Sequence, residues 1–190
     1  MRPITGEILI EAPRAAVFDF VANECNEPLY NPNMLRADQL TPGPVGVGTR
    51  FTAVMKGPRS TTVAIEYMGF NRPQVLNSLS RTAGMDIEGE LSFAAEGKQT
   101  RLTWIWRLRP RGALRLVTPL VRALGSRQEH NNWKALKKYL ETPATDSIRS
   151  DMRNLNARRK PRGPPLARKV SWSVLALDHE VGTADNACQL

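Results

Sequence analysis

Residues 86–109 read DIEGELSFAAEGKQTRLTWIWRLR, and this stretch predicts the β-hairpin that decides the fold. The turn falls at Gly97-Lys98, because glycine in the first central position suits the type II′ turn that matches the twist of paired strands. A slip of one residue would turn every apolar side chain outward, so the register is well specified. The predicted pairs are Phe93 with Leu102, Leu91 with Trp104, Gly89 with Trp106 and Ile87 with Leu108 on the apolar face, and Glu88 with Arg107 and Asp86 with Arg109 on the charged face.

The chain before this hairpin predicts a strand, two short helical segments and then more strands. Residues 4–12 alternate between apolar and polar side chains, which is the period of a strand. Pro13 ends that strand and opens a short helix to about residue 22, and Pro28 and Pro32 leave room for one helical turn around residues 27–30. From residue 35 onward, glycine and proline punctuation fits five or six strands. In residues 75–83 both faces carry similar side chains, so the orientation of that strand stays open.

Residues 112–141 predict a long helix that ends at Thr142-Pro143, because proline cannot continue it. The apolar face of this helix changes direction between its two halves. We expect Pro119 and Gly125-Ser126 to absorb the change as a kink. The face consists of Leu114, Val117, Val121 and Leu124 in the first half, and of Trp133, Leu136 and Leu140 in the second.

Length and composition limit the number of domains that the chain can form. The chain has 190 residues, of which 41% are hydrophobic and 24% charged, which fits one α+β domain over residues 3–142 and an appendage. Residues 143–190 are predicted to form a basic, disordered tail, because proline and basic residues dominate residues 158–165. No apolar run reaches the roughly 20 residues of a membrane-spanning helix. Glu7 and Glu11, in an N-terminal stretch without an apolar core, favour a cytoplasmic protein.

Several short patterns, in this order of elements, resemble a known family. They are Ile8-Leu9-Ile10-Glu11-Ala12-Pro13, Val17-Phe18-Asp19-Phe20-Val21-Ala22-Asn23, Asn31-Pro32, Gly46-Val47-Gly48-Thr49-Arg50-Phe51, Thr100-Arg101-Leu102-Thr103-Trp104 and residues 133–141, WKALKKYLE. Over residues 4–142 they resemble the polyketide cyclase/dehydrase and lipid-transport family of the SRPBCC, or START/Bet v1-like, superfamily. The resemblance implies a helix-grip fold of the α+β class, in which a seven-stranded antiparallel sheet wraps around a long C-terminal helix, with two short helices after the first strand. It also implies a cavity between sheet and last helix, but no universal catalytic motif and so no catalytic residue.

The inward positions of these elements are the candidates for the lining of such a cavity. Ligand cavities are mostly apolar with a few polar groups, although each of these residues also suits ordinary core packing. Trp104 and Trp106 place two indole N–H groups on one face, and a ligand head group, a backbone carbonyl or water can accept from them. The candidate ligand-binding residues are Tyr30, Phe51, Met55, Tyr67, Leu91, Trp104, Trp106, Val117, Leu120 and Leu124.

The cavity and the tail lead to three functional hypotheses. The first is a protein that binds a small hydrophobic molecule, of lipid, polyketide or isoprenoid type, and catalyses no reaction. The second is a cyclase or dehydratase that uses the same cavity, with Tyr67, Tyr30 or Asp19 moving a proton. The third is contact of the basic tail with nucleic acid or an anionic membrane, which the net charge of +9 allows.

The motifs of cofactor and metal sites are absent from the sequence. Gly46-Val47-Gly48 lacks the rest of a dinucleotide fingerprint, and no zinc or EF-hand spacing occurs. His130 stands among polar residues of the last helix, where we expect it to be exposed. Asp86 and Glu88 face arginines, which predicts a solvated, ion-paired surface. We therefore expect neither a cofactor nor a metal.

Overall fold

The computed structural model describes residues 2–57, 61–115 and 118–142, without the side chains of residues 113, 114 and 118–122. Within them, seven strands form one sheet in the order β1-β7-β6-β5-β4-β3-β2, and all neighbouring strands are antiparallel. The seven-stranded antiparallel sheet is thus confirmed, whereas the predicted tail lies outside the described residues. The strands are β1 (Ile4–Ile10), β2 (Met34–Gln39), β3 (Arg50–Met55), β4 (Thr61–Asn71), β5 (Val75–Arg81), β6 (Met85–Glu96) and β7 (Gln99–Pro110).

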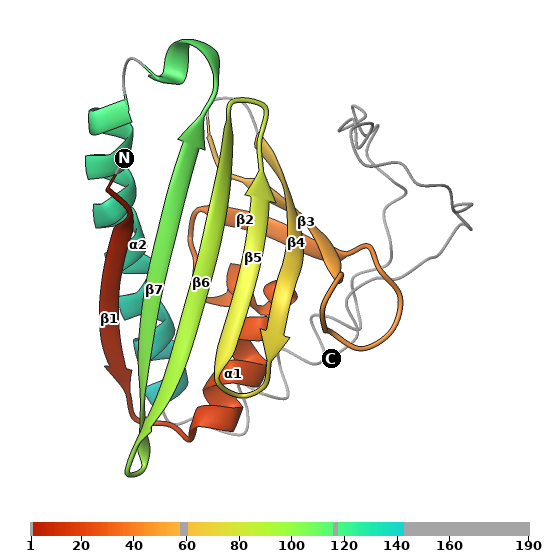
Figure 1. The fold of residues 1–190 in the computed structure, drawn as a ribbon. Coiled ribbons are helices and arrows are strands. Elements are labelled where there is room, and N and C mark those ends of the chain that lie inside the picture. Colours follow the sequence, from red (N-terminus) through yellow and green to blue (C-terminus); the bar gives the residue numbers. More distant parts are fainter. Residues whose placement is uncertain (1, 58–60, 116–117, 143–190) are drawn as a thin grey trace. The chain divides into compact units, whose positions relative to one another are not determined.

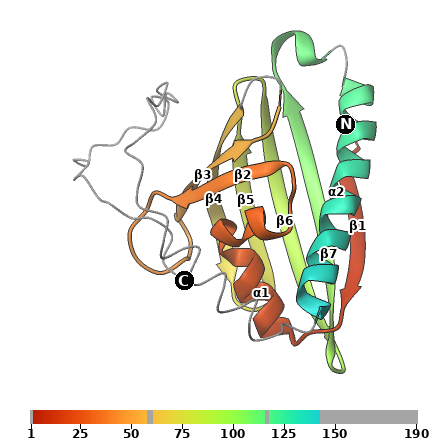
Figure 2. The same cartoon turned by 180° about the vertical axis from the view of Figure 1, so that it is seen from behind.

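The two α-helices lie on the same face of this sheet, as Figures 1 and 2 show from opposite sides. Helix α1 (Arg14–Ala22) follows the first strand, and α2 (Thr118–Glu141) is the last described element. Two 3-10 helices, η1 (Glu24–Leu29) and η2 (Gly112–Arg115), precede β2 and α2. In the described part of the chain, no helix combines the length and apolarity needed to cross a membrane. The cytoplasmic location stays a prediction.

The predicted boundaries need small corrections near the N-terminus. Strand β1 ends at Ile10 rather than at residue 12, because the chain turns there and the N–H of Ala12 donates to the carbonyl of Ile10 at 2.9 Å. The helical turn predicted around residues 27–30 begins earlier, at Glu24. Asn23 explains the early start, since its side-chain oxygen accepts from the N–H of residue 25 at 3.2 Å and so caps the segment.

Helix α2 requires a second set of corrections. The 3-10 helix η2 occupies the start of the predicted helix, and α2 itself begins at Thr118. Pro119 therefore falls in the first turn, where the missing N–H leaves no intrahelical bond broken. Gly125 allows close packing, because a Cβ there would lie 3.3 Å from the Cδ1 of Ile4. Helix α2 is continuous through Gly125, and the kink stays a prediction. The glycine lets the helix approach strand β1.

The central hairpin has the predicted register. Strands β6 and β7 pair Leu91 with Trp104. Gly97 has a φ of +61°, the left-handed conformation that a primed turn requires. The other predicted pairs are confirmed as well, namely Phe93 with Leu102, Gly89 with Trp106, Ile87 with Leu108, Glu88 with Arg107 and Asp86 with Arg109.

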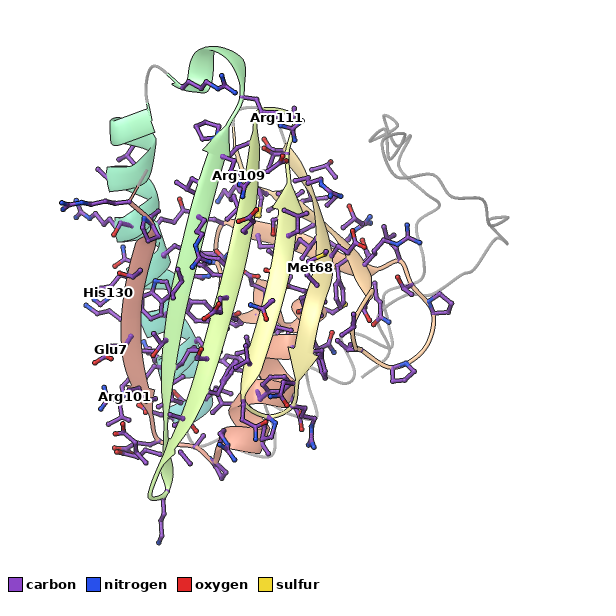
Figure 3. The ribbon with its side chains drawn as sticks, in the orientation of Figure 1. Glu7, Met68, Arg101, Arg109, Arg111 and His130 are labelled. Carbon is purple, nitrogen blue, oxygen red and sulfur yellow. The ribbon has the colours of Figure 1, made fainter. Side chains whose placement is uncertain are left out.

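The ion pairs on the outer face of the hairpin run diagonally across this register. Arg109 contacts Glu88 at 2.7 Å, and Arg111 contacts Asp86. Strand twist brings diagonal neighbours within reach of a long side chain, so each arginine binds a carboxylate that is not directly opposite. Figure 3 shows Arg109 and Arg111 near the same end of β7. The expected ion-paired surface is present.

Strand β5 answers the question of orientation that the sequence left open. In the register Leu76 lies between Phe70 of β4 and Leu91 of β6, and only 3% of its surface is exposed. Ser78 and Ser80 share its face, because side chains two apart on a strand point the same way. Two hydroxyl groups therefore belong to the inner face of the sheet, the face that the helices cover.

Candidate functional site

The inner face of the sheet is tightly packed in one part and partly exposed in another. We call the packed part the closed half and the partly exposed part the open half. Both halves lie on the same strands, β5, β6 and β7. The closed half consists of Leu76, Leu91, Phe93, Leu102 and Trp104, all buried, and the open half of Ser78, Ser80, Ile87, Trp106 and Leu108, all half-buried.

Helix α1 and the C-terminal part of α2 cover the closed half. Phe18 of α1 packs edge-on against Phe93, with ring centroids 5.0 Å apart. Trp133 of α2 stacks on Trp104 at 5.5 Å. On its other side Trp104 lies against β1, where a Cβ on Gly6 would come within 2.3 Å of the indole ring. The closed half is thus ordinary protein core.

The open half begins at a row of residues that crosses four strands. Tyr67 of β4, Ser78 of β5, Gly89 of β6 and Trp106 of β7 are paired in register. A Cβ on Gly89 would lie 2.1 Å from a ring carbon of Trp106, so the indole lies across the glycine. In this position its N–H donates to Oε2 of Glu129 on α2 at 3.0 Å. A carboxylate, rather than a backbone carbonyl or water, is therefore the acceptor for this indole.

Three carboxyl groups lie near this row and act on one another or on Tyr30 through their charge, and we call Glu24, Glu27 and Glu129 the acidic cluster. Tyr67 Oη donates to the carbonyl of Ala22 at 2.8 Å and lies 3.1 Å from Oε1 of Glu24. The negative charge of Glu27 also acts on Glu24. Because η1 supplies two of the carboxyls and α2 the third, the cluster joins these two elements above the sheet.

Two carboxyl groups of the cluster, those of Glu24 and Glu129, have raised pKa values. Burial raises the pKa of Glu24 well above its usual value, and the charge of Glu27 raises it further, against a smaller effect of Tyr67. Burial, followed by the charge of Glu27, raises the pKa of Glu129 to about 7. The N–H of Trp106, which donates to Glu129, partly offsets these effects. Glu129 thus changes its charge near neutral pH.

The charges that act on this site are all negative within the described part of the chain. Burial raises the pKa of Tyr30 well above its usual value, and the charges of Glu27, Glu24 and Glu129 raise it further. Burial and then Glu24 do the same for the pKa of Tyr67. None of the ion pairs among the described residues includes a member of the acidic cluster. No described group of acidic, histidine or cysteine residues has the arrangement of a metal site.

Asn132 connects the acidic cluster to a pocket beside helix α2. Its Nδ2 donates to Oε1 of Glu27 at 3.3 Å, and Asn31 donates to the same oxygen at 2.7 Å. Only 8% of Asn132 is exposed, and its Oδ1 has no hydrogen-bond partner among the described residues. The pocket measures about 330 Å³ and is lined by Pro32, Asn33, Leu124, Arg127, Gln128, Asn131, Asn132 and Ala135.

The predicted lining residues fall into three groups. Phe51, Tyr67, Leu91, Trp104 and Tyr30 are buried in the core, with at most 9% of their surfaces exposed. Met55 and Trp106 are half-buried, and Leu124 is 63% exposed and lines the pocket beside α2. Val117 and the side chain of Leu120 lie outside the described residues. Contact of any of them with a ligand stays a prediction.

The acidic cluster was not predicted from the sequence. Residue 129 stands in the polar stretch of the last helix where His130 was expected to be exposed; His130 is exposed, whereas Glu129 is half-buried. A signal was present, since Glu129, Trp133, Leu136 and Leu140 are spaced by four, three and four residues, so a carboxylate extends the buried stripe. Asp19, considered as a proton donor, is half exposed instead and pairs with Arg72 at 2.6 Å.

Comparison with known structures shows where this fold recurs. A protein from Thermus thermophilus matches with a TM-score of 0.65 and 16% identity, over 75% of this chain and 99% of its own. A START superfamily protein from Mycobacterium smegmatis matches with a TM-score of 0.63 and 13% identity, over 74% and 98%. These similarities establish the helix-grip fold of START/Bet v1-like proteins.

A third similar structure is a biosynthetic protein. The di-domain ARO/CYC protein StfQ, from the steffimycin biosynthetic pathway, has a TM-score of 0.57 and 16% identity. The match covers 79% of this chain and 46% of StfQ. No curated protein matches the sequence. The model of one protein family, described as polyketide cyclase/dehydrase and lipid transport, matches residues 1–141. The chain therefore belongs to the polyketide cyclase/dehydrase and lipid-transport family.

Proposed function

We propose that the open half of the inner face binds a small hydrophobic molecule, of lipid, polyketide or isoprenoid type, between the sheet and helix α2. The exposure of inward-facing apolar residues carries this proposal. Ile87, Trp106 and Leu108 keep part of their surface exposed, whereas Leu91 and Trp104 on the same strands are buried. Large apolar side chains that point into a domain are usually buried, so their partial exposure supports a space that a ligand fills.

The polar groups of the open half suit such a site. Ser78 and Ser80 add hydroxyl groups to an apolar surface, and Trp106 and Glu129 lie at its edge. Ligand sites commonly combine apolar walls with a few polar groups that fix orientation. Affinity would come from buried apolar area, at about 25 cal/mol per Å², less the cost of ordering the ligand. Membership in a family described by lipid transport and polyketide chemistry agrees with this ligand class.

Two neighbouring substitutions on β5 test the proposal. Ser80 points to the inner face and Leu79 to the outer face, so Ser80→Phe fills the proposed site and Leu79→Phe is its matched control. We expect Ser80→Phe to weaken binding of a fluorescent fatty-acid probe about tenfold or more, and Leu79→Phe to leave it nearly unchanged. Native mass spectrometry of the freshly purified full chain would identify a copurified ligand. Absence of probe binding, or equal effects of the two substitutions, would contradict the proposal.

Glu129 supports a cyclase or dehydratase as a second candidate function. A pKa of about 7 suits a group that both takes and returns protons at neutral pH. Its carboxylate could take a proton from a carbon between two carbonyl groups of a bound chain, and its acid form could protonate a departing hydroxyl. Tyr30 and Tyr67 suit this work less, because burial raises the pKa of both phenols.

The test of this candidate is turnover of a linear poly-β-ketone thioester by the full chain. If the protein is a cyclase, the turnover rate should rise as the pH increases through about 7, where Glu129 loses its proton. Glu129→Gln should abolish this pH dependence together with most of the rate. Binding without turnover, or a rate that Glu129→Gln leaves unchanged, would leave ligand binding as the function.

A further inference from the structure

We infer that the open half takes an amphiphile whose polar end is a protonated amine. The acidic cluster and the side-chain oxygen of Asn132 would hold the ammonium group, and Ile87 and Leu108 would contact the apolar part. This inference rests on the proposed function, because it names the chemical class of the ligand for the same site.

The balance of charge at the site is the first argument. Glu24 and Glu27 lie on η1 and Glu129 on α2, and the side chains that donate hydrogen bonds to them are all neutral, namely Tyr67, Trp106, Asn31 and Asn132. The three side chains are half-buried, and carboxyl groups withdrawn from water are normally either paired with a positive charge or kept neutral by a proton. Here no such partner occurs among the described residues, although the chain carries a net charge of +9. A cationic ligand would supply the missing partner.

The second argument is independent of charge and comes from Asn132. Its Oδ1 is a buried acceptor that no described group satisfies, next to an amide nitrogen that already donates to Glu27. An unsatisfied buried acceptor is costly, so a ligand that donates to it gains affinity. An ammonium group carries up to three donors. It could therefore serve Asn132 and a carboxylate of the cluster at the same time.

The surrounding side chains agree with a cation at this place. The aromatic rings of Tyr30, Tyr67 and Trp106 lie beside the acidic cluster, and a cation is attracted to the face of such a ring. Arg127 lines the pocket beside α2, is exposed, and is the one basic residue among those lining residues. It opposes a cation at the pocket mouth, whereas the acidic cluster favours one in the interior.

Binding of a cation should be coupled to release of a proton. The titratable groups that face Glu129 and Glu24 from η1, β4 and the segment before β2 are Glu27, Tyr67 and Tyr30. Below about pH 7, Glu129 is largely protonated and must lose its proton before it can pair with an ammonium group. A primary amine titrates near 10.4, as in lysine, and stays charged throughout. Affinity for the amine should therefore rise between pH 6 and pH 8.

Titration calorimetry of the full chain with three ten-carbon probes tests the inference. The probes are decylammonium, decanol and decanoate, each kept below its micelle concentration. We expect decylammonium to bind about tenfold tighter than decanol, and decanoate to bind weakest. Its affinity should rise from pH 6 to pH 8 with proton release, while that of decanol stays constant.

Three variants test which residues cause the preference for decylammonium over decanol. Glu129→Gln and Asn132→Leu should each reduce the ratio of decylammonium to decanol affinity about fivefold or more. Glu90→Gln makes the same charge change on the outer face of β6 and should leave the ratio within about twofold. Equal binding of decylammonium and decanol by the unmodified chain would overturn the inference and leave the proposed function standing. Absence of binding by all three probes would overturn both. A preference that survives in Glu129→Gln and Asn132→Leu would overturn the assignment to this cluster.

Discussion

The closed and open halves of the inner face are built on the same three strands but differ in what covers them. In the closed half, Trp104 is held between β1 and Trp133, and the leucines around it are buried. In the open half, Trp106 lies across a glycine and donates its N–H to a carboxylate of α2. Two tryptophans separated by one residue thus serve different purposes: one fills the core, and the other connects the sheet to a polar site.

This difference shows how a small domain can combine a stable core with a partly exposed apolar surface, which we propose as the binding site. The closed half excludes water and supplies the apolar burial that stabilises the fold. The open half keeps polar groups and partly exposed apolar side chains together on a surface that the closed half holds in place. A substitution should therefore affect stability in one half and ligand binding in the other.

The largest expected effect compares two leucines on strand β7, one in the closed half and one in the open half. Leu102 and Leu108 both point inward from β7, but Leu102 is fully buried and Leu108 half-buried. Leu102→Ala should lower the free energy of unfolding by about 2–5 kcal/mol, because it leaves a cavity in the packed core. Leu108→Ala should cost about 1 kcal/mol or less. Urea denaturation of both variants measures the difference, and equal losses would remove the distinction between the halves.

The next effect concerns the pH dependence of stability. The usual pKa of a glutamic acid is 4.5, whereas that of Glu129 in the folded protein is about 7. Between these values the folded state keeps a proton that the unfolded state has lost, so its contribution to stability is present at low pH and is lost as the pH rises through 7. We expect the free energy of unfolding to fall by roughly 1–3 kcal/mol across this range. The raised pKa of Glu24 acts in the same direction.

Glu129→Gln should flatten that profile, because glutamine does not titrate. Urea denaturation at pH 5, 6, 7 and 8 would measure it, with Glu90→Gln as the control that keeps the slope of the unmodified chain. A profile as steep in Glu129→Gln as in the unmodified chain would show that Glu129 does not carry the proton.

A smaller effect compares two hydroxyl groups in the row that separates the halves. Tyr67→Phe removes the donor to the carbonyl of Ala22 and should cost about 1 kcal/mol of unfolding free energy. Ser78→Ala removes a hydroxyl without a hydrogen bond among the described residues and should change stability by less than about 0.5 kcal/mol. Thermal unfolding of the two variants is a sufficient measurement. If Ser78→Ala lowers the free energy of unfolding more than Tyr67→Phe does, polar contacts in the open half contribute to the stability of the fold.

The smallest effects are expected on the outer face. Arg101, which pairs with Glu7 and Glu96, lies behind the closed half, and Arg109, which pairs with Glu88, lies behind the open half. Both arginines are exposed in part, so Arg101→Ala and Arg109→Ala should each change the free energy of unfolding by less than about 1 kcal/mol. Similarly small losses of unfolding free energy in both variants would mean that the difference between the halves arises from the inner face alone. A loss of several kcal/mol for either variant would contradict that assignment.

The sequence predicted the parts of this protein that depend on alternation along a strand. The register of β6 and β7 followed from one turn and two alternating runs, because a slip would have exposed Trp104 and Leu91. The orientation of β5 did not follow, since leucine and serine occur on both of its faces. Its neighbours decide it, as Leu76 meets Phe70 and Leu91.

The acidic cluster escaped prediction for a different reason. Its carboxyl groups come from η1 and α2, which are more than a hundred residues apart in the chain, as the 105-residue separation of Glu27 and Asn132 illustrates. A single glutamate in a polar stretch reads as exposed, because carboxylates rarely lie in the interior. Only the tertiary packing that brings Glu129 over Trp106 reveals it. In the sequence, the spacing of Glu129 from Trp133 and the need of the Trp106 N–H for an acceptor are compatible with this arrangement but do not specify it.

The contact of Gly125 with Ile4 has a consequence for synthesis on the ribosome. Strand β1 emerges first, but it pairs only with β7, and the helix that covers Ile4 emerges later still. The apolar side chains of β1 therefore lack their native cover until nearly the whole domain has left the exit tunnel. We expect nascent chains that end before β7 to be clients of ribosome-associated chaperones, and the domain to complete its fold only when α2 arrives.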